Sequence, residues 1–492
     1  MTCRCILLVA LVASASAASV FQRPINSDCV RVSTASTDAS LFPNEFQISG
    51  TAVVNSDDYT EVETSTGFTV TYYDNYKVLN NTLAGEAYTL TQCGVSVAAN
   101  ELPSDARPFS IPLVSLSLPE TVPYAFLELL GVTDRVYDVS EYVVAPCGQR
   151  LVQSCNRVAP DSLSLNNAAL LSSTIGAYTD GLVTSSNSAW PTQFTFSATE
   201  DPGLLQRAEW IKFLGVFFNL DAYSSNLFTA IKNEFEQTKA AALAQEGPRP
   251  VVAWINHFMY GTQEWYQLSF AAYKTELVEA AGGQNLNYTD ILEIEGVQPT
   301  EFSPSDLAFA WGTNETFANQ TLALEAFLSV LAEADIVIDE TFVADPSTYH
   351  LGEFLLQFSS EGVFPTAEDV WFSAGKILRT DGLISAAAGL DWYEGAIPRP
   401  GKVLLDLVST TRPEALTAPH TPIWLRNIKD DPVVVTAADC TTAANGCSAS
   451  PSTICPFISF CGNGSPVLLE TNPTTGALPT GGKCTYAACP AA

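Results

Sequence analysis

Two series of alternating strands and helices, separated by one long helical stretch, limit the folds that this chain of 492 residues can adopt. In the first series, residues 111–118, 121–131 and 135–139 predict a strand, a short helix and a second strand. Such a unit requires parallel strands joined by a right-handed crossover. The second series predicts strands at 250–255 and 334–342 and helices at 268–283, 320–333 and 400–414. The fold class expected is therefore α/β, with two Rossmann-like lobes at 68–202 and 248–429.

The segment that joins the two lobes, 203–247, has the apolar spacing of a helix. Trp210, Phe213 and Phe217 recur on one face, and Phe228, Ile231 and Phe235 continue the spacing of three and four. Gly247 and Pro248 end the pattern. We expect one long connecting helix.

The two ends of the chain differ from the lobes in composition. Residues 1–18 carry Arg4, a short apolar run and small residues suited to cleavage, as in a secretory signal peptide. Residues 19–67 are polar and predict a loop-rich lead-in. The tail, 430–492, holds six of the ten cysteines that would remain after cleavage, without a C-x-x-C pair. We expect a disulfide-rich tail and no metal site.

Composition excludes several classes of function. The formal net charge of −31 disfavours nucleic acid as a partner. With three histidines and no G-x-S-x-G, H-E-x-x-H, Walker or G-x-G-x-x-G motif, a histidine-based catalytic or metal centre is not expected. Five N-x-S/T sequons, at Asn80, Asn287, Asn314, Asn319 and Asn463, agree with a secreted or cell-surface glycoprotein.

An unusual density of aromatic rings follows the first strand of the second lobe, in the stretch WINHFMYGTQEWY at 254–266. Ligands of open α/β sheets sit beyond the carboxyl ends of the strands, so we interpret this stretch as a loop that faces a cleft between the lobes. Aromatic side chains there would bury large flat areas of a ligand. The candidate ligand-binding residues are Trp254, His257, Tyr260, Phe217, Phe218 and Trp392, with Glu394 and Tyr142 as hydrogen-bonding partners.

The stretches GVTDRVYDVS, AGGQNLN and LDWYEGAIPRPGKVLLDL resemble the periplasmic binding proteins whose lobes are joined by a long helix, a class that binds cobalamin, siderophores and haem. Together with the signal peptide, the sequons and the cysteine-rich tail, the chain resembles the cobalamin acquisition proteins of eukaryotic microalgae. The resemblance covers about 68–412. It implies that aromatic residues stack on the corrin, at Phe217 or Phe218, at Trp254, and at Trp392 with Glu394. It further implies a non-enzymatic protein that passes cobalamin (vitamin B12) to a membrane transporter or receptor.

Two alternatives stay open at this point. Haem would want an axial ligand, for which His257 and Tyr260 are available, and a ferric siderophore would want cleft cations. A secreted glycoside hydrolase would use a pair of carboxylates, for which Glu340 and Glu394 are the candidates.

Overall fold

The computed structural model describes residues 59–441 except 74, 96, 101, 161–170, 172–174, 187–189, 295, 304–306 and 314–316, together with residue 29 and the backbone of 458–460 and 466–468. The predicted signal peptide, nearly all of the lead-in before residue 59 and the tail cysteines after Cys440 lie outside the described residues. Within these ranges, no helix has the length and apolar character needed to cross a membrane.

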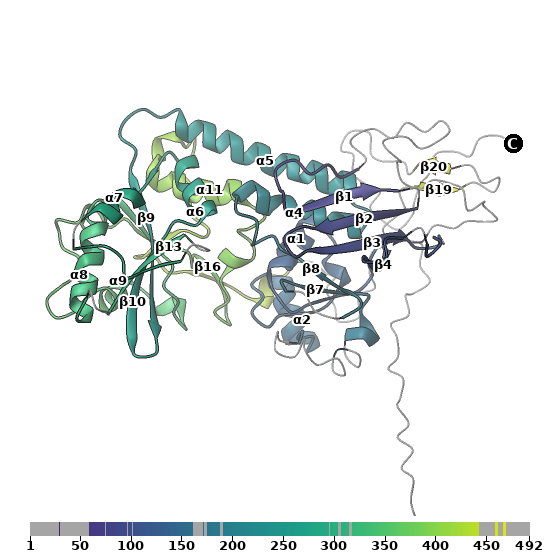
Figure 1. The fold of residues 1–492 in the computed structure, drawn as a ribbon, viewed down its shortest axis with the longest axis horizontal. Coiled ribbons are helices and arrows are strands. Elements are labelled where there is room, and N and C mark those ends of the chain that lie inside the picture. Colours follow the sequence, from purple (N-terminus) through teal and green to yellow (C-terminus); the bar gives the residue numbers. More distant parts are fainter. Residues whose placement is uncertain are drawn as a thin grey trace, which may run out of the picture.

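Lobe one contains two four-stranded sheets (Figure 1). The first has the order β1-β2-β3-β4 and is antiparallel except for its last pair, with strands at Phe68–Tyr72, Tyr76–Asn81, Glu86–Gln92 and Arg107–Ile111. The second has the order β6-β5-β7-β8 and is parallel throughout, with β5 at Leu116–Leu118, β6 at Val136–Val139, β7 at Gly181–Thr184 and β8 at Gln193–Thr195. The helical elements of lobe one include α1 (Val122–Leu130), η2 (Thr133–Arg135) and α2 (Pro146–Cys155). The predicted strand–helix–strand unit is confirmed.

Lobe two is built on one eight-stranded mixed sheet, with the order β12-β13-β10-β9-β14-β15-β17 and β11 beside β9. Its strands are β9 (Val251–Tyr260), β10 (Gln263–Ser269), β11 (Gln284–Asn285), β12 (Glu301–Ser303), β13 (Ala308–Gly312), β14 (Ile336–Asp339), β15 (Ile377–Arg379) and β17 (Arg426–Asn427). A separate parallel pair joins β16 (Leu383–Ser385) to β18 (Val433–Val435). The helices are α6 (Ala272–Ala280), α7 (Tyr288–Glu293), α8 (Gln320–Leu331), α9 (Leu351–Gln357), α10 (Val370–Ser373) and α11 (Pro400–Thr411), with short 3-10 turns η4 (Pro346–Thr348), η5 (Asp391–Tyr393), η6 (Pro413–Ala415) and η7 (Ala437–Asp439). The backbone of the tail adds β19 (Ile458–Phe460) and β20 (Pro466–Leu468), which pair with each other.

Two helices, and not one, connect the lobes. α4 (Leu204–Phe217) ends where Asn219 adopts a left-handed backbone conformation (φ 55°), and α5 (Asp221–Leu243) begins directly afterwards. Asparagine tolerates that conformation better than most residues do, so it can break a helix without the glycine or proline that usually signals a break. The apolar spacing alone therefore gave no warning. α5 then runs along both lobes (Figure 1) and packs against α4 and α11.

Two of these predictions are corrected. The stretch 254–266 is not a loop: β9 continues to Tyr260, turns at Gly261 (φ 64°) and returns as β10. The strand predicted at 111–118 is divided, because residues 112–115 form a turn between β4 and β5.

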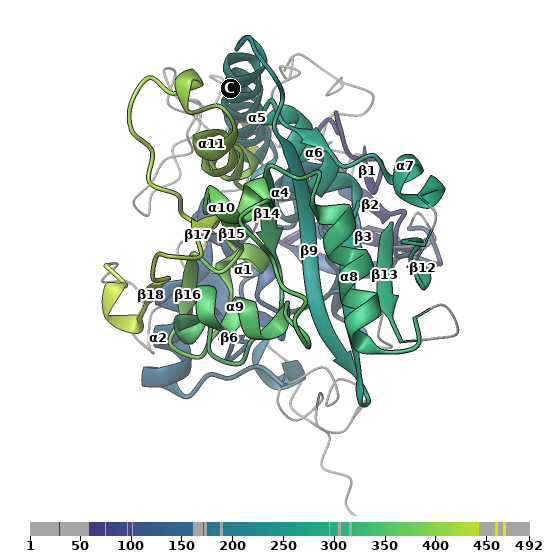
Figure 2. The same ribbon diagram turned by 90° about the vertical axis from the view of Figure 1, so that its left-hand side faces the viewer.

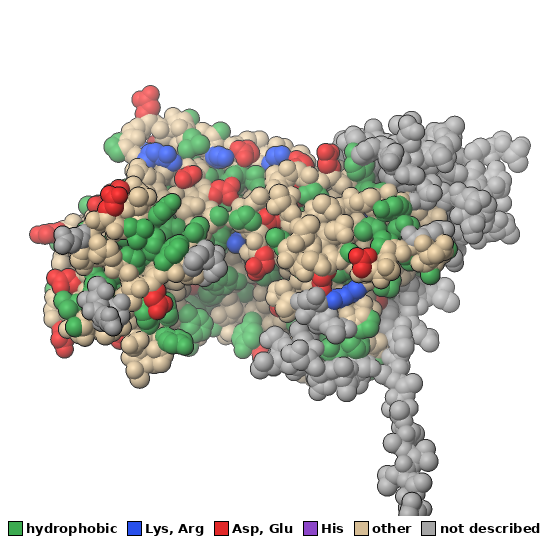
Figure 3. Space-filling model, in the orientation of Figure 1, with side chains coloured by type: hydrophobic (Ala, Val, Ile, Leu, Met, Phe, Trp, Pro, Cys, Tyr) green, Lys and Arg blue, Asp and Glu red, His purple; other side chains and the backbone are tan. Residues whose placement is uncertain are grey.

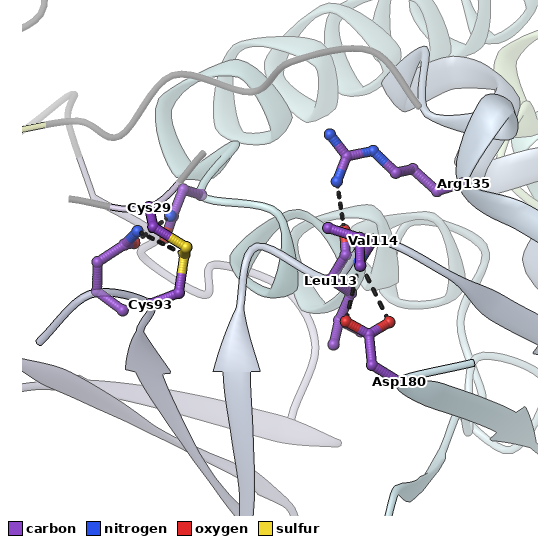
Figure 4. The surroundings of a disulfide bond; sticks show 8 residues. Cys29, Cys93, Leu113, Val114, Arg135 and Asp180 are labelled. Carbon is purple, nitrogen blue, oxygen red and sulfur yellow. Dashed lines mark hydrogen bonds between the residues drawn. A yellow bond between two sulfur atoms is a disulfide. The ribbon is translucent and has the colours of Figure 1, made fainter. Parts of the chain in front are cut away.

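That turn is held by charged side chains of lobe one (Figure 4). The Arg135 guanidinium donates a hydrogen bond of 2.6 Å to the carbonyl of Leu113, and the Asp180 carboxylate accepts from the amides of Val114 and Ser115. Nearby, the disulfide between Cys29 and Cys93 ties the lead-in to the end of β3. These contacts fix the turn at the start of β5, which is an inner strand of the parallel sheet of lobe one.

Among the described residues, apolar side chains form a large and a small core in lobe one and a core on each face of the lobe-two sheet. The lobe-one core takes in α4, with Trp210 and Phe213 at its centre. In lobe two, Phe327 and Trp311 lie in the core under α8, whereas Trp254 and Leu404 lie in the core under α11. The second of these also includes Leu204 and Phe235 from α4 and α5. The connecting helices therefore pack into both lobes.

Candidate functional site: a cleft between the lobes

The carboxyl ends of the parallel strands from both lobes turn toward one region. On lobe one, Glu120, Tyr142 and Ser185 follow β5, β6 and β7, and Glu120 accepts hydrogen bonds from the amide and hydroxyl of Ser185 (2.9 and 2.7 Å). On lobe two, β14 and β15 end at Asp339 and Arg379. The surface is hollowed between the lobes (Figure 3). Because open α/β sheets bind ligands at these ends, this cleft is the candidate site.

Aromatic rings project from the free end of the β9–β10 hairpin. Side chains alternate between the two faces of a strand, so Trp254, Phe258 and Tyr260 share one face of β9. That face is turned to lobe one, because Trp254 packs on Trp392 and the next residues of that loop contact lobe one. Phe258 stacks with Trp265 on β10. Tyr260 is 76% exposed, and Tyr142 on lobe one is 59% exposed.

A pocket of about 230 Å³ lies where α4 leaves lobe one, and we call it the hinge pocket. Its walls come from both halves: Thr199 and Arg207 from the α4 region, Tyr273 from α6, and Trp392 and Tyr393 from η5. The Arg207 guanidinium lies over the Tyr273 ring (3.9 Å to its centroid) and donates to the carbonyls of Thr199 and Asp201. Trp392 is thus the one predicted aromatic anchor among the described residues that lines a pocket.

The other predicted anchors lie elsewhere. Trp254 and Trp392 contact each other (5.9 Å between centroids) in the core under α11, at 2% and 6% exposure, so both belong to lobe two. Phe217 and Phe218 are fully buried in the lobe-one core. His257 points to the opposite face of β9 from Trp254, between Tyr266 and Phe358, and burial lowers its pKa. The structure therefore leaves Tyr142 and Tyr260 exposed beyond β6 and at the end of β9, and it places Trp392 in the wall of the hinge pocket. Phe217, Phe218 and His257 are buried inside the lobes.

Glu394 joins the lobes. Its carboxylate accepts hydrogen bonds from the backbone amides of Val144 (2.8 Å) and Ala145 (2.9 Å), which lead into α2 of lobe one. Only 1% of the residue is exposed, and burial, with a smaller contribution from Asp391, raises the pKa of the carboxyl to about 8. A ligand in the cleft has no access to this side chain, so its predicted contact with a ligand is replaced by a structural contact between lobes.

Three further contacts lie beside Glu394, and we call the set the lobe seam. Cys147 of α2 forms a disulfide with Cys440, which follows η7. The side-chain amide of Gln149 donates a hydrogen bond to the carbonyl of Val435 on β18 (3.0 Å), and α2 lies next to β18 in Figure 2. The backbone at Gly389 approaches the carbonyl of Tyr142 so closely that a Cβ there would lie 2.2 Å from that oxygen. One cysteine of the predicted disulfide-rich tail, Cys440, is therefore bonded to lobe one.

The cations around the cleft are largely neutralised. Arg379 pairs with Asp339 (2.8 Å) and Asp381 (2.7 Å), and Lys274 pairs with Glu340. Arg207 has no recorded carboxylate ion pair within the described part of the chain. No group of three or more His, Cys, Asp or Glu among the described residues is arranged to hold a metal ion.

Sequence reasoning missed Arg207 and Tyr273 as members of the site. Arg207 lies in α4, a helix that is buried nearly all round and whose sequence predicts only core packing, and Tyr273 lies in the first turn of a helix without any motif. The signal available was positional: Tyr273 follows a strand of the ring-rich hairpin, and Arg207 opens the connecting segment.

No protein-family model matches the chain, and the comparison with curated proteins finds no match. Several solved structures are similar in fold. A periplasmic haem-binding protein from Pseudomonas aeruginosa is 15% identical, covers 66% of this chain and 99% of its own, and has a TM-score of 0.38. A periplasmic solute-binding protein from Veillonella parvula is 10% identical, covers 70% of this chain and 89% of its own, and has a TM-score of 0.41. An ABC-transporter substrate-binding protein from Listeria monocytogenes is 11% identical, covers 61% and 98%, and has a TM-score of 0.35.

Similarity at these scores carries no argument about a ligand. The mixed α/β class, with two lobes, parallel sheets and a helical connection, is established by the strand pairings of this chain itself.

Proposed function

We propose that the protein is an extracellular solute-binding protein that captures cobalamin in the cleft between its lobes for uptake by a membrane transporter or receptor, without a chemical step. The observation that supports the proposal most is the exposure of rings beyond the strand ends of both lobes, Tyr142 after β6 on lobe one and Phe258 with Tyr260 at the end of β9 on lobe two. A corrin is a rigid, roughly flat ring system, so it loses little entropy on binding between such walls.

The size of the hinge pocket constrains the pose. At about 230 Å³ it is smaller than the range of about 300–1,000 Å³ that holds a drug-sized ligand. We therefore expect only an edge of the corrin, with its amide groups, to enter the hinge pocket near Arg207 and Tyr393. The plane of the ring would lie against Tyr142 and the hairpin rings.

Charge supports an amide-fringed ligand over a strongly anionic one. The ion pairs of Arg379 and Lys274 leave little positive charge for the carboxylates of a siderophore. The net charge of −31 further disfavours approach of an anion.

The proposal is tested by titrating the mature protein with cyanocobalamin by isothermal calorimetry. Replacing Tyr142 and Tyr260 together by Ala is expected to weaken binding about 100-fold, since exposed aromatic anchors contribute about 1–2 kcal/mol each. Tyr178→Ala is the matched control, because Tyr178 is similarly exposed (51%) but precedes β7, at the end of that strand opposite the cleft. If cyanocobalamin does not bind, or if the double variant binds as well as the wild type, the proposal is wrong.

Haem is the second candidate, favoured by one observation: Tyr260 offers an exposed phenol as an axial ligand. Absorbance titration with haemin separates the two candidates, since a Soret shift lost in Tyr260→Phe together with no response to cobalamin would assign haem. The hydrolase alternative loses support, because Glu394 is buried in the lobe seam and Glu340 is paired with Lys274.

A further inference from the structure

A cavity of about 850 Å³ lies away from the cleft, and we call it the distal pocket. Its lining comes from α6, β11, α7, β12 and β13. β11 pairs with Val251 and Val252 at the start of β9, whereas the cleft lies at the other end of that strand. Hydrophobic side chains gather on the surface over these elements (Figure 3). The distal pocket is therefore a site separate from the one proposed for the solute.

Aromatic rings form the apolar part of the distal pocket. Phe309 contacts Phe302 (4.9 Å between centroids), Phe270 (5.6 Å) and Tyr288 (6.4 Å). Phe302 and Tyr288 are exposed, as is Leu292, another lining residue from α7. Rings exposed in this way at a concave surface are available to a guest, and the volume lies within the range of small-molecule sites.

Polar groups complete the lining of the distal pocket. Arg249 precedes β9, and its recorded hydrogen bond is a long one (3.3 Å) to the carbonyl of Glu279. Within the described ranges no ion pair is recorded for its guanidinium. The side-chain amides of Gln284, Asn285 and Asn287 also line the pocket. Asn285 uses its Nδ2 on the carbonyl of Thr275, and Asn287 uses its Oδ1 on the amide of Thr289.

One acidic side chain, that of Glu279, also lines the pocket. It is exposed and opposes the charge of Arg249. The distal pocket thus combines apolar rings with a cation, amide donors and a single carboxylate.

We propose that the distal pocket is a second binding site, which takes a small amphipathic carboxylate with an aromatic or branched apolar body against the Phe309 cluster and its anionic group at Arg249. This assignment does not depend on the ligand of the cleft. It follows from the combination of rings and donors within one cavity, because a ligand that is apolar throughout would leave the amides and guanidinium without new partners.

The experiment uses two fluorescent probes of similar shape and different charge. Anilinonaphthalene sulfonate is anionic, and N-phenyl-1-naphthylamine is neutral. The wild type is expected to bind one molecule of each probe saturably. Phe302→Ser and Leu292→Ser, two variants at exposed wall positions, are each expected to weaken both probes about fivefold or more, which corresponds to about 1 kcal/mol. Phe342→Ser, at an exposed ring outside the distal pocket, is the control and is expected to change neither.

A separate pair of variants tests whether the distal pocket prefers an anionic ligand. Arg249→Gln is expected to weaken the anionic probe about fivefold and to leave the neutral probe within twofold, while Glu279→Gln strengthens the anionic probe. Circular dichroism and the thermal midpoint confirm that each variant is folded. Equal effects of Arg249→Gln on both probes would overturn the anionic assignment. Probe binding that is unchanged in both wall variants, or that is lost in the Tyr142 and Tyr260 double variant, would place the probes in the cleft and overturn the site.

Discussion

Glu394 gives the sharpest test of how the lobes are held together. The buried carboxyl receives two backbone amides at 2.8 and 2.9 Å, which favour its charged form, but its removal from water favours the neutral form. Burial is the larger effect and raises the pKa to about 8, against an ordinary value of 4.5. Between these values the folded protein holds one proton more at this site than the unfolded chain does. The free energy of unfolding must therefore fall as the pH rises from 5 to 8, by up to about 1.4 kcal/mol for each pH unit.

The perturbation is Glu394→Gln, which cannot titrate. We expect the difference in unfolding free energy between wild type and variant to shift by about 2–4 kcal/mol in favour of the variant between pH 5 and pH 8. Glu394→Ala removes both acceptors and leaves two buried amides unpaired at every pH, at a cost of about 1–3 kcal/mol for each amide. The two variants thus separate the titration of the group from its hydrogen bonds.

Urea denaturation at pH 5, 6, 7 and 8 measures these quantities, with tryptophan fluorescence and far-UV circular dichroism followed in parallel. Coincident transitions show that the lobes unfold as one unit, which the seam requires. Other buried carboxyls also titrate in this range, since burial raises the pKa of Asp138 to about 6. The comparison with Glu394→Gln cancels their contribution. Parallel curves for wild type and Glu394→Gln would show that the amides outweigh burial and would refute the reasoning.

Three other perturbations test the seam and the shared core. Replacing Cys147 and Cys440 by Ser opens a loop of 293 residues and is expected to lower the free energy of unfolding by about 2–5 kcal/mol; a loss under about 1 kcal/mol in urea denaturation would contradict the entropic argument. Gly389→Ala places a Cβ against the facing carbonyl of lobe one and should cost about 1–3 kcal/mol, whereas Gly352→Ala, with open space around it, should cause no loss. Trp392→Ala is expected to lower the free energy of unfolding by about 3–5 kcal/mol as a core substitution; a thermal midpoint within a degree or two of the wild type would argue against its core role.

The alternation of strands and helices could be predicted because buried parallel strands and amphipathic helices leave different apolar spacings in the sequence. The hairpin at 251–269 could not, since His257 and Asn256 interrupt the apolar run and only pairing with β10 keeps the backbone extended. Once the strand continues, its period of two sends Trp254 and His257 to opposite faces. The aromatic residues of 254–266, which were predicted to form one loop facing the cleft, are therefore divided between the two cores of lobe two and the exposed end of the hairpin.

The site residues were harder to predict because their roles depend on contacts distant in the sequence. Glu394 meets its partners 249 and 250 residues away, and nothing next to DWYEG indicates α2. A carboxylate after two rings is equally typical of a ligand site and of a buried structural contact. Trp392 lines the hinge pocket and also packs on Trp254 in the core under α11, a contact between rings 138 positions apart that the sequence could not indicate.

The seam and the connecting helices hold the cleft on two sides. α4 and α5 contribute Leu204 and Phe235 to a core of lobe two, and on the other side a disulfide fixes the Cα atoms of Cys147 and Cys440 at 4.8 Å. Rotation of one lobe away from the other about the helices would have to break the bonds of Glu394 and would be stopped by the disulfide. Access to the cleft is therefore easiest on the side of the β9–β10 hairpin, whose end is free of the seam. Because the folded protein already fixes the two lobes, ligand binding does not have to order them. Binding should therefore depend on the exposed hairpin rings more than on lobe motion.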